Sequence, residues 1–440
     1  MNPDGNPTTN RRAWLIVALL CVFMFINFAD KAMLGLAGTR IADELGLSPF
    51  TYGVVASSFY LLFSVSAIAV GFLATRVDAR RIVFVLALVW TVAQLSVGLL
   101  PGLAVLVASR ILLGSSEGPV YPLAAHLTHR WFPNRTRHLP TSLLAMSAAL
   151  GGIVAAPVIT VIIVYFGWRS GFVALGAVSL VWSGLWLQWG IGPQGIQPDR
   201  PEPARPSDAW RIPYRKIFTT PTWLATTAAA FTGLWCVSLL VTWVPTYLEK
   251  VGHYSAPRAG LLYALPWLAA GIWMPLSSAI CRRLAARGWT LAQARLALIA
   301  GGLIAASVCT LAMTRLHSGP AQVAMLTLAA MGYSNVTAIF PVICAELVPP
   351  GQRSAVLGTT TGLASVGALL APAVMGWIVQ AGDTVAAGLT NGFAVTAVLL
   401  VAGGLVAARW IRPTRDRRRL AWESLAPAEW SASRPRARVH

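Results

Sequence analysis

The chain has 440 residues, of which 56% are hydrophobic and only 11% charged, and its formal net charge is +19. Soluble domains carry about 25% charged residues, so this composition excludes a soluble domain and indicates a polytopic membrane protein. Its apolar segments are long enough to cross ~30 Å of hydrocarbon as helices. The strands of a membrane β-barrel would alternate in polarity and run to only ~10 residues.

Twelve apolar segments follow one another along the chain: 13–36, 51–74, 82–100, 104–128, 139–165, 170–190, 222–248, 258–281, 291–314, 319–347, 354–380 and 387–411. We therefore expect an all-α membrane protein with twelve transmembrane helices in two six-helix bundles. The stretch 191–217 is Pro-rich, charged and without periodicity, which predicts a cytoplasmic linker. The predicted units are a bundle over 1–190, this linker, a bundle over 218–411, and a basic, solvated tail over 412–440.

Basic residues are concentrated in both tails, in the linker and in every second loop. The positive-inside rule then places both termini and the linker in the cytoplasm, and the even number of spans agrees. We expect a multi-pass protein of the cell's inner membrane, whose first span stays in place as a signal anchor. The basic excess is also suited to contact with anionic lipid headgroups, and we expect no nucleic-acid partner.

No motif for an enzyme, a cofactor or a metal stands out. A nucleotide-binding motif and catalytic-triad spacing are missing from the sequence, so we expect neither an ATP-driven pump nor a hydrolase. The five cysteines lie in or at the ends of spans and are interpreted as small apolar residues. His126, His129 and His138 cluster near the end of the fourth span, and we interpret them as contacts to headgroups or loop carbonyls.

The two halves share a local repeat. The fifth segment contains "GIVAAP" (152–157) and the eleventh contains "GALLAP" (367–372). Segments four and ten also end alike, each in a Pro-containing turn with a basic residue. Matches at corresponding places in two six-span halves indicate a duplication.

These features resemble the major facilitator superfamily over the whole chain. The stretch "GFLATRVDARR" (71–81) is similar to its signature loop, which implies that Gly71, Arg76, Arg80 and Arg81 form a cytoplasmic latch. The signature's acidic position holds Thr75 here, and its second glycine is Asp78. In the second half we expect Arg353 to serve the latch, and Glu346 to pair with Arg353 or with a latch residue.

Four ionisable residues fall inside predicted spans: Asp30, Lys31, Arg110 and Glu117. A charge on a lipid face costs about 2.5 to 3.5 kcal/mol on insertion scales, so these side chains must face a cavity or one another. Arg110 and Glu117 are seven residues apart, which places both on one side of a helix but ~10 Å apart along it. We therefore expect each to have its own partner on another helix.

Two interpretations of this cluster remain open. In one, the four residues form structural ion pairs that join spans one and four. In the other, which we favour, the two bases hold an anion and the two acids exchange protons. Lys31 is one of only three lysines among 34 basic residues, and an ammonium is a compact charge suited to a carboxylate.

A narrower resemblance supports the second interpretation. "INFADKAMLGLA" (26–37) and "RILLGSSEGPVYP" (110–122) are similar to motifs of the anion:cation symporter family, which includes hexuronate, galactonate and phthalate permeases. The matching positions are Asn27, Asp30, Arg110, Gly114, Glu117, Gly118, Pro119 and Pro122, while Lys31 stands where that family usually has arginine. The resemblance implies that Asp30 and Glu117 couple protons and that Lys31 and Arg110 contact the anion.

We therefore expect a proton-coupled symporter that takes up a small organic anion by alternating access and acts as a monomer. Further candidates for substrate contact are polar or aromatic: Asn27, Tyr60, Trp235, Trp243, Tyr333 and Asn335. Aromatic faces suit flat or apolar bodies, which favours an aromatic or less hydroxylated carboxylate over a sugar acid. The alternatives are proton-driven efflux of a drug or metabolite through the same fold, an uncoupled facilitator, and a non-transporting sensor.

Overall fold

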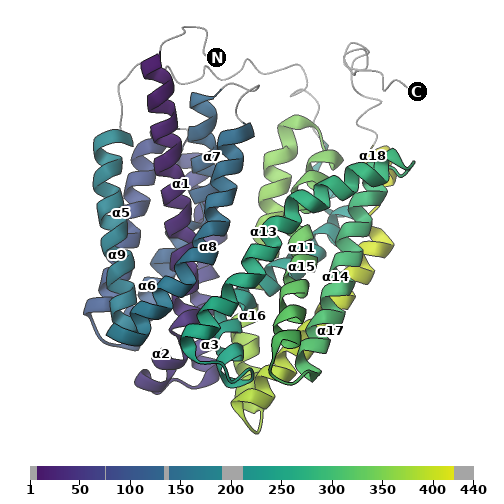
Figure 1. Ribbon diagram of the computed structural model, residues 1–440. Coiled ribbons are helices and arrows are strands. Elements are labelled where there is room, and N and C mark those ends of the chain that lie inside the picture. Colours follow the sequence, from purple (N-terminus) through teal and green to yellow (C-terminus); the bar gives the residue numbers. More distant parts are fainter. Residues whose placement is uncertain (1–6, 75, 133–137, 191–211, 421–440) are drawn as a thin grey trace.

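The computed structural model describes residues 7–74, 76–132, 138–190 and 212–420 (Figure 1). All regular elements in these ranges are helical, and twelve helical stretches are long and apolar enough to cross a membrane. The prediction of an all-α protein with twelve transmembrane helices is confirmed.

The first bundle contains α1 (Pro7–Leu36), α2 (Gly38–Leu45), α3 (Pro49–Leu61), α4 (Phe63–Leu73), α5 (Ala79–Leu99), α6 (Leu103–Glu117), α7 (Val120–Trp131), α8 (His138–Phe166) and α9 (Trp168–Leu185), and it ends in a π turn, Trp186–Gly190. Two spans are broken helices: α3 continues as α4, and α6 continues as α7. Gly118 and Pro119 stand at the second break, directly after Glu117. The short α2 lies outside the spans, at the end of the bundle remote from the labelled termini (Figure 1).

The second bundle contains α10 (Tyr214–Phe218), α11 (Pro221–Thr242), α12 (Val244–Lys250), α13 (Ala256–Ala286), α14 (Leu291–Arg315), α15 (Pro320–Leu347), a 3₁₀ turn at Pro350–Gln352, α16 (Arg353–Ala381), α17 (Val385–Trp410) and α18 (Pro413–Leu420). Thr220 caps α11 by accepting a hydrogen bond from the Trp223 amide, and Thr290 forms a capping box with Gln293 at α14. These caps supply partners for amides that the first helical turn leaves unpaired.

Small residues let the two bundles approach closely. A Cβ added at Gly53 of α3 would lie 2.3 Å from the carbonyl oxygen of Pro372 in α16, and one at Gly376 would lie 2.3 Å from that of Pro49. The Tyr52 hydroxyl bridges the bundles by donating toward the carbonyl of Thr242 (3.2 Å). These contacts lie toward the α2 end, and a larger residue at either glycine would push the bundles apart.

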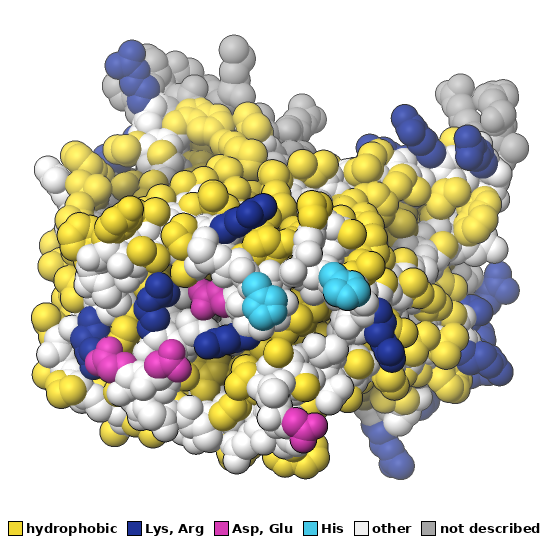
Figure 2. Space-filling model, turned by 60° about the horizontal axis from the view of Figure 1, so that its bottom comes forward, with side chains coloured by type: hydrophobic (Ala, Val, Ile, Leu, Met, Phe, Trp, Pro, Cys, Tyr) yellow, Lys and Arg dark blue, Asp and Glu magenta, His cyan; other side chains and the backbone are white. Residues whose placement is uncertain are grey.

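A polar contact adds to this junction. Thr39 Oγ1 of α2 donates to Glu249 Oε2 of α12 over 2.9 Å. Burial at the junction raises the pKa of Glu249 and the facing Asp43 adds to that effect, whereas the Thr39 hydrogen bond and the charges of Arg40 and Lys250 oppose it. Figure 2 shows this end of the molecule, where acidic side chains lie next to basic ones.

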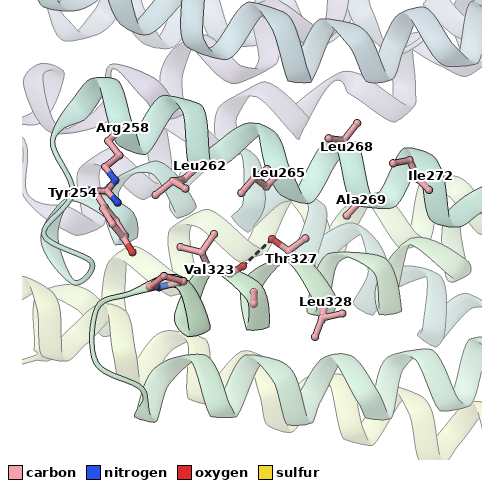
Figure 3. A pocket seen from close by; sticks show the side chains of 12 residues that line it. Tyr254, Arg258, Leu262, Leu265, Leu268, Ala269, Ile272, Val323, Thr327 and Leu328 are labelled. Carbon is pink, nitrogen blue, oxygen red and sulfur yellow. Dashed lines mark hydrogen bonds between the residues drawn. The ribbon is translucent and has the colours of Figure 1, made fainter.

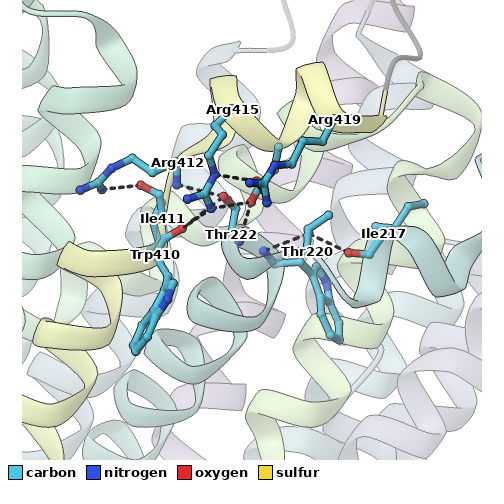
Figure 4. Close-up of polar contacts among 10 residues, drawn as sticks. Ile217, Thr220, Thr222, Trp410, Ile411, Arg412, Arg415 and Arg419 are labelled. Atoms are coloured by element: carbon cyan, nitrogen blue, oxygen red, sulfur yellow. Dashed lines mark hydrogen bonds and ion pairs between the residues drawn. The ribbon is translucent and has the colours of Figure 1, made fainter.

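Residues 413–420 correct the expectation of a solvated tail. They form α18, in which Asp416 is fully buried and accepts a hydrogen bond from the Thr222 amide over 2.9 Å, in the first turn of α11 (Figure 4). Burial opposes ionisation of Asp416, but hydrogen bonds from Arg415 and Thr222 leave its pKa below the ordinary value. The tail docks because one acid meets both a helix N-terminus and arginine neighbours. Residues 421–440, like most of the predicted linker, lie outside the described residues.

Candidate functional site

The four ionisable residues come together in the first bundle, between α1 and α6. Asp30 and Lys31 are adjacent in α1, and their side chains diverge because consecutive helical residues are turned by ~100°. A Cβ on Gly114 of α6 would lie 1.7 Å from the Phe59 carbonyl oxygen. Glycine at this position therefore brings α3 onto α6 beside the charged residues.

Asp30 and Arg110 are joined through the amide of Gln94 in α5. Gln94 Nε2 donates to Asp30 Oδ1 over 2.7 Å, and Arg110 Nη2 donates to Gln94 Oε1 over 3.3 Å. All three side chains are buried. The Arg110 guanidinium also lies 5.3 Å from the centre of the Phe172 ring, a cation–π distance. The amide thus holds an acid and a base in one network without direct contact between them.

Lys31 and Glu117 form a direct ion pair. Lys31 Nζ lies 2.7 Å from Glu117 Oε2, and the Lys31 side chain is 15% exposed while that of Glu117 is fully buried. Lys31 also donates to Asn27 Oδ1 and lies 4.6 Å from the centre of the Phe28 ring. The prediction that Arg110 and Glu117 each have a partner on another helix is confirmed.

Three polar atoms of the network have no hydrogen-bond partner within the part of the chain that the structure describes. Asp30 Oδ2, Glu117 Oε1 and Arg110 Nε are buried without a hydrogen-bond partner among the described residues. Buried polar groups in proteins are rarely left unpaired. An unpaired buried group costs about 1–3 kcal/mol of stability, and a charged one costs more. Two acceptors on acids and one donor on a base are the groups that a proton and an anion would use.

Lys31 and Arg110 share a small cavity between the bundles. Its other lining residues are Leu34, Ala56, Phe59 and Tyr60 from the first bundle and Val241 and Thr242 from the second. The cavity measures about 20 Å³, which holds about one water molecule. A multi-atom anion would therefore need the bundles to separate before it reached both bases.

The predicted substrate residues divide into two groups. Asn27 contacts Lys31, and Tyr60 lines the cavity with both bases. The others have partners elsewhere: Trp235 donates to Thr396 (3.4 Å), Trp243 to the Pro372 carbonyl (3.1 Å), Asn335 accepts from Trp273 (3.0 Å), and Tyr333 lines a separate small cavity in the second bundle. The structure does not bring these four to the charged cluster.

The signature loop is held within the first bundle. Asp78 pairs with Arg80 over 2.5 Å and lies 3.9 Å from Arg130 of α7. The Arg80 hydrogen bonds lower the pKa of Asp78. Arg76, Arg81 and Gly71 are exposed, and a Cβ at Gly71 would meet nothing within 4 Å. The signature loop thus has its acid at position 78 instead of position 75, where Arg80 and Arg130 are its basic partners.

The expected pairing of Glu346 with Arg353 is wrong. Glu346 pairs with Arg295 of α14, whereas Arg353 Nε donates to the Ala345 carbonyl over 3.0 Å. Arg353 is the first residue of α16, and its side chain turns back to the end of α15. Glu346 therefore pairs with the neighbouring helix α14 and not with Arg353.

The sequence interpretation missed Gln94, which connects Asp30 to Arg110. It also missed Phe28 and Phe172, the aromatic faces beside Lys31 and Arg110. Gln94 is the one amide side chain in the third apolar segment (82–100), which was the available indication. The phenylalanines gave none, because apolar rings are ordinary in a membrane span.

A twelve-span bundle pair with buried opposite charges and a cavity between its halves is typical of secondary transporters. The Major Facilitator Superfamily matches residues 20–314, more than half of the chain. The chain belongs to this superfamily, as the signature loop predicted, and is a multi-pass transporter rather than an enzyme.

Several relatives with curated names are named as transporters of organic anions. A probable sulfoacetate transporter of Cupriavidus necator is 26% identical over 383 residues, covering 83% of this chain and 87% of that protein. The hexuronate transporter of Bacillus subtilis is 25% identical over 405 residues, covering 90% and 94%. The D-galactonate transporter of Escherichia coli is 26% identical over 406 residues, covering 86% and 92%. The resemblance to the anion:cation symporter type is confirmed.

Solved structures agree on the fold. A bacterial homologue of the human lysosomal transporter Spinster, in an inward-facing and occupied conformation, superposes with a TM-score of 0.77 at 17% identity, covering 92% of this chain and 98% of that one. A D-xylose–proton symporter superposes with a TM-score of 0.72 at 12% identity, covering 91% and 98%.

Proposed function

We propose that this protein is a proton-coupled symporter of the inner membrane that imports a small organic anion carrying a carboxylate. The observation that carries the proposal is the buried set of two acids and two bases, in which Lys31 pairs with Glu117 and Arg110 is joined to Asp30 through Gln94. Sulfoacetate, hexuronate and D-galactonate, the substrates in the relatives' names, are all carboxylates.

Protonation is the first step of the proposed cycle. A proton on Glu117 removes the counter-charge of Lys31, and a proton on Asp30 weakens the link to Arg110 through Gln94. The site then holds two positive charges without internal counter-ions. Such a state is costly in a medium of low dielectric constant, so it favours the entry of an anion.

Substrate binding is the second step. The incoming carboxylate replaces the internal counter-charge on Lys31 and Arg110, and the remainder of the molecule lies against Tyr60, Phe59 and the second bundle. The loaded site carries little net charge, so the two bundles can rock past each other without stranding an ion in hydrocarbon. Loss of the protons on the other side restores the internal pairs and expels the anion.

The orientation follows from the distribution of basic residues. With both termini in the cytoplasm, the α2 end faces the opposite side, and the contacts of Gly53, Gly376 and Thr39 close that side. The structure then represents a conformation closed to the exterior. Protons taken up from an acidic exterior must therefore bind after this contact opens.

Uptake by the purified protein in liposomes tests the proposal. Radiolabelled carboxylates, including hexuronates, aldonates, sulfoacetate and simple aromatic acids, are offered with the interior alkaline and again without a pH gradient. We expect one class to accumulate only with the gradient, and an inward proton current to accompany it. Accumulation driven by sodium alone, or expulsion of cations or neutral compounds driven by the gradient, would contradict the proposal.

A further inference from the structure

A groove runs along the outer surface of the second bundle, between α13 and α15. It measures about 560 Å³ (Figure 3). Its walls are formed by apolar side chains, chiefly Leu262, Leu265, Leu268, Ile272, Val323 and Leu328. The Thr327 hydroxyl in this wall is already bonded to the Val323 carbonyl over 2.8 Å. Most of the groove therefore offers contacts to hydrocarbon only.

The polar groups gather at one end. Arg258 and Tyr254 lie there together, with the guanidinium 5.2 Å from the centre of the tyrosine ring (Figure 3). Arg258 is exposed, the lining contains no acid, and no salt bridge is formed by Arg258 within the described residues. Helices α13 and α15 also begin at this end, so the positive ends of two helix dipoles add to the charge. The end of the groove is suited to an anion.

The length of the groove fits one leaflet of a membrane. Fourteen residues separate Arg258 from Ile272 along α13, both of which line it, and at 1.5 Å per residue this spans about 21 Å. One leaflet measures about 20 Å when its headgroup region is included. A lipid with its phosphate at Arg258 would therefore extend an acyl chain to about the middle of the membrane.

We infer that this groove binds an anionic phospholipid, with its phosphate on Arg258 and one acyl chain along α13 and α15. A polar substrate is unsuited to walls without free hydrogen-bonding groups. A zwitterionic lipid would fill the groove but would bring its own cation to Arg258. Helix α13 also packs on α8 across the junction, where a Cβ on Gly260 would lie 2.3 Å from Thr160 Oγ1. The lipid would therefore lie along a helix that also contacts the first bundle.

Native mass spectrometry of the purified protein tests this inference. The protein is equilibrated with equal amounts of phosphatidylglycerol and phosphatidylcholine that carry the same acyl chains. We expect retained phosphatidylglycerol to exceed phosphatidylcholine about fivefold, the effect of one arginine near a membrane surface. Arg258→Gln should remove that preference, and Ala324→Trp, which fills the groove from α15, should remove both lipids.

Arg315→Gln is the matched control, because Arg315 is an exposed cation at the same end of the bundle and the last residue of α14. It should keep the fivefold preference. A second measurement needs no variant: phosphatidylglycerol added to the protein in detergent should raise its thermal midpoint more than phosphatidylcholine does. Equal retention of the two lipids by the natural protein, or a preference that survives Arg258→Gln, would overturn the inference.

Discussion

Gln94 makes a sharp prediction because it joins the acid and the base of one half of the site. Gln94→Leu keeps a side chain of similar size but removes the hydrogen bonds to Asp30 and Arg110, which measure 2.7 and 3.3 Å. A hydrogen bond to a charged group contributes about 1.5–3 kcal/mol, so the loss of two sets an upper range of about 3–6 kcal/mol. If Arg110 approached Asp30 directly in the variant, part of this lost free energy would be recovered.

Two assays separate stability from coupling. The thermal midpoint of Gln94→Leu in detergent should fall, and the pH dependence of uptake should shift, because Asp30 loses the donor that stabilises its ionised form. Gln322→Leu is the control: Gln322 is equally buried and donates to the Tyr247 hydroxyl over 3.1 Å, but lies in the second bundle. It should lower the midpoint and leave the pH profile in place. An unchanged midpoint and profile in Gln94→Leu would refute the role of the amide.

Three further variants test separate parts of the account. Arg110→Ala should reduce binding of the carboxylate below detection in equilibrium binding assays, and unchanged affinity would move the anion site elsewhere. Lys31→Arg should retain at least part of the uptake rate, because the symporter family usually has arginine there; complete loss would show that the compact ammonium is needed. Burial in the closed junction raises the pKa of Glu249, so the closed form binds a proton more tightly than the open one. Closure should be favoured at low pH and lost as the pH rises through the raised pKa. Spin-label distances across the α2–α12 junction should show this for the natural protein and no pH dependence for Glu249→Gln.

The sequence predicted the architecture because hydrophobic length decides it. The sequence contains twelve apolar segments long enough to span a membrane, and residues 191–217 divide them into six and six. This pattern predicts two six-helix bundles. The glycines of the two repeats also lie at helix contacts: a Cβ at Gly152 would lie 3.1 Å from Trp267, and one at Gly367 would lie 2.4 Å from the Phe231 carbonyl oxygen. A side chain at Gly367 would meet backbone, whereas one at Gly152 would require the Trp267 ring to shift by a few tenths of an ångström.

Pairings and long-range contacts were harder to predict. The four charges had to find partners, but only the structure shows that Lys31 selects Glu117 and that Gln94 stands between Asp30 and Arg110. Gln94 stands out as the one amide of its segment, but the sequence does not show which charged side chains it joins.

The contacts of the aromatic candidates and of the tail could not be predicted from the sequence, for a related reason. Trp235 and Trp243 satisfy their indole N–H groups inside the second bundle and at its junction with the first, and composition does not distinguish such packing from substrate contact. Docking of α18 depends on a single acid, Asp416, within a run of arginines. A charge count suggests a solvated tail, whereas the position of that acid beside the first turn of α11 determines the outcome.

The central claim is that the acids of the cluster exchange protons while the bases hold the anion. Asp30→Asn in liposomes tests it most directly, with uphill uptake driven by a pH gradient and substrate-for-substrate exchange without a gradient measured on the same preparation. The account predicts that uphill uptake is abolished while exchange continues, because the neutral amide imitates the protonated acid. Uphill uptake that persists while exchange is lost would contradict it.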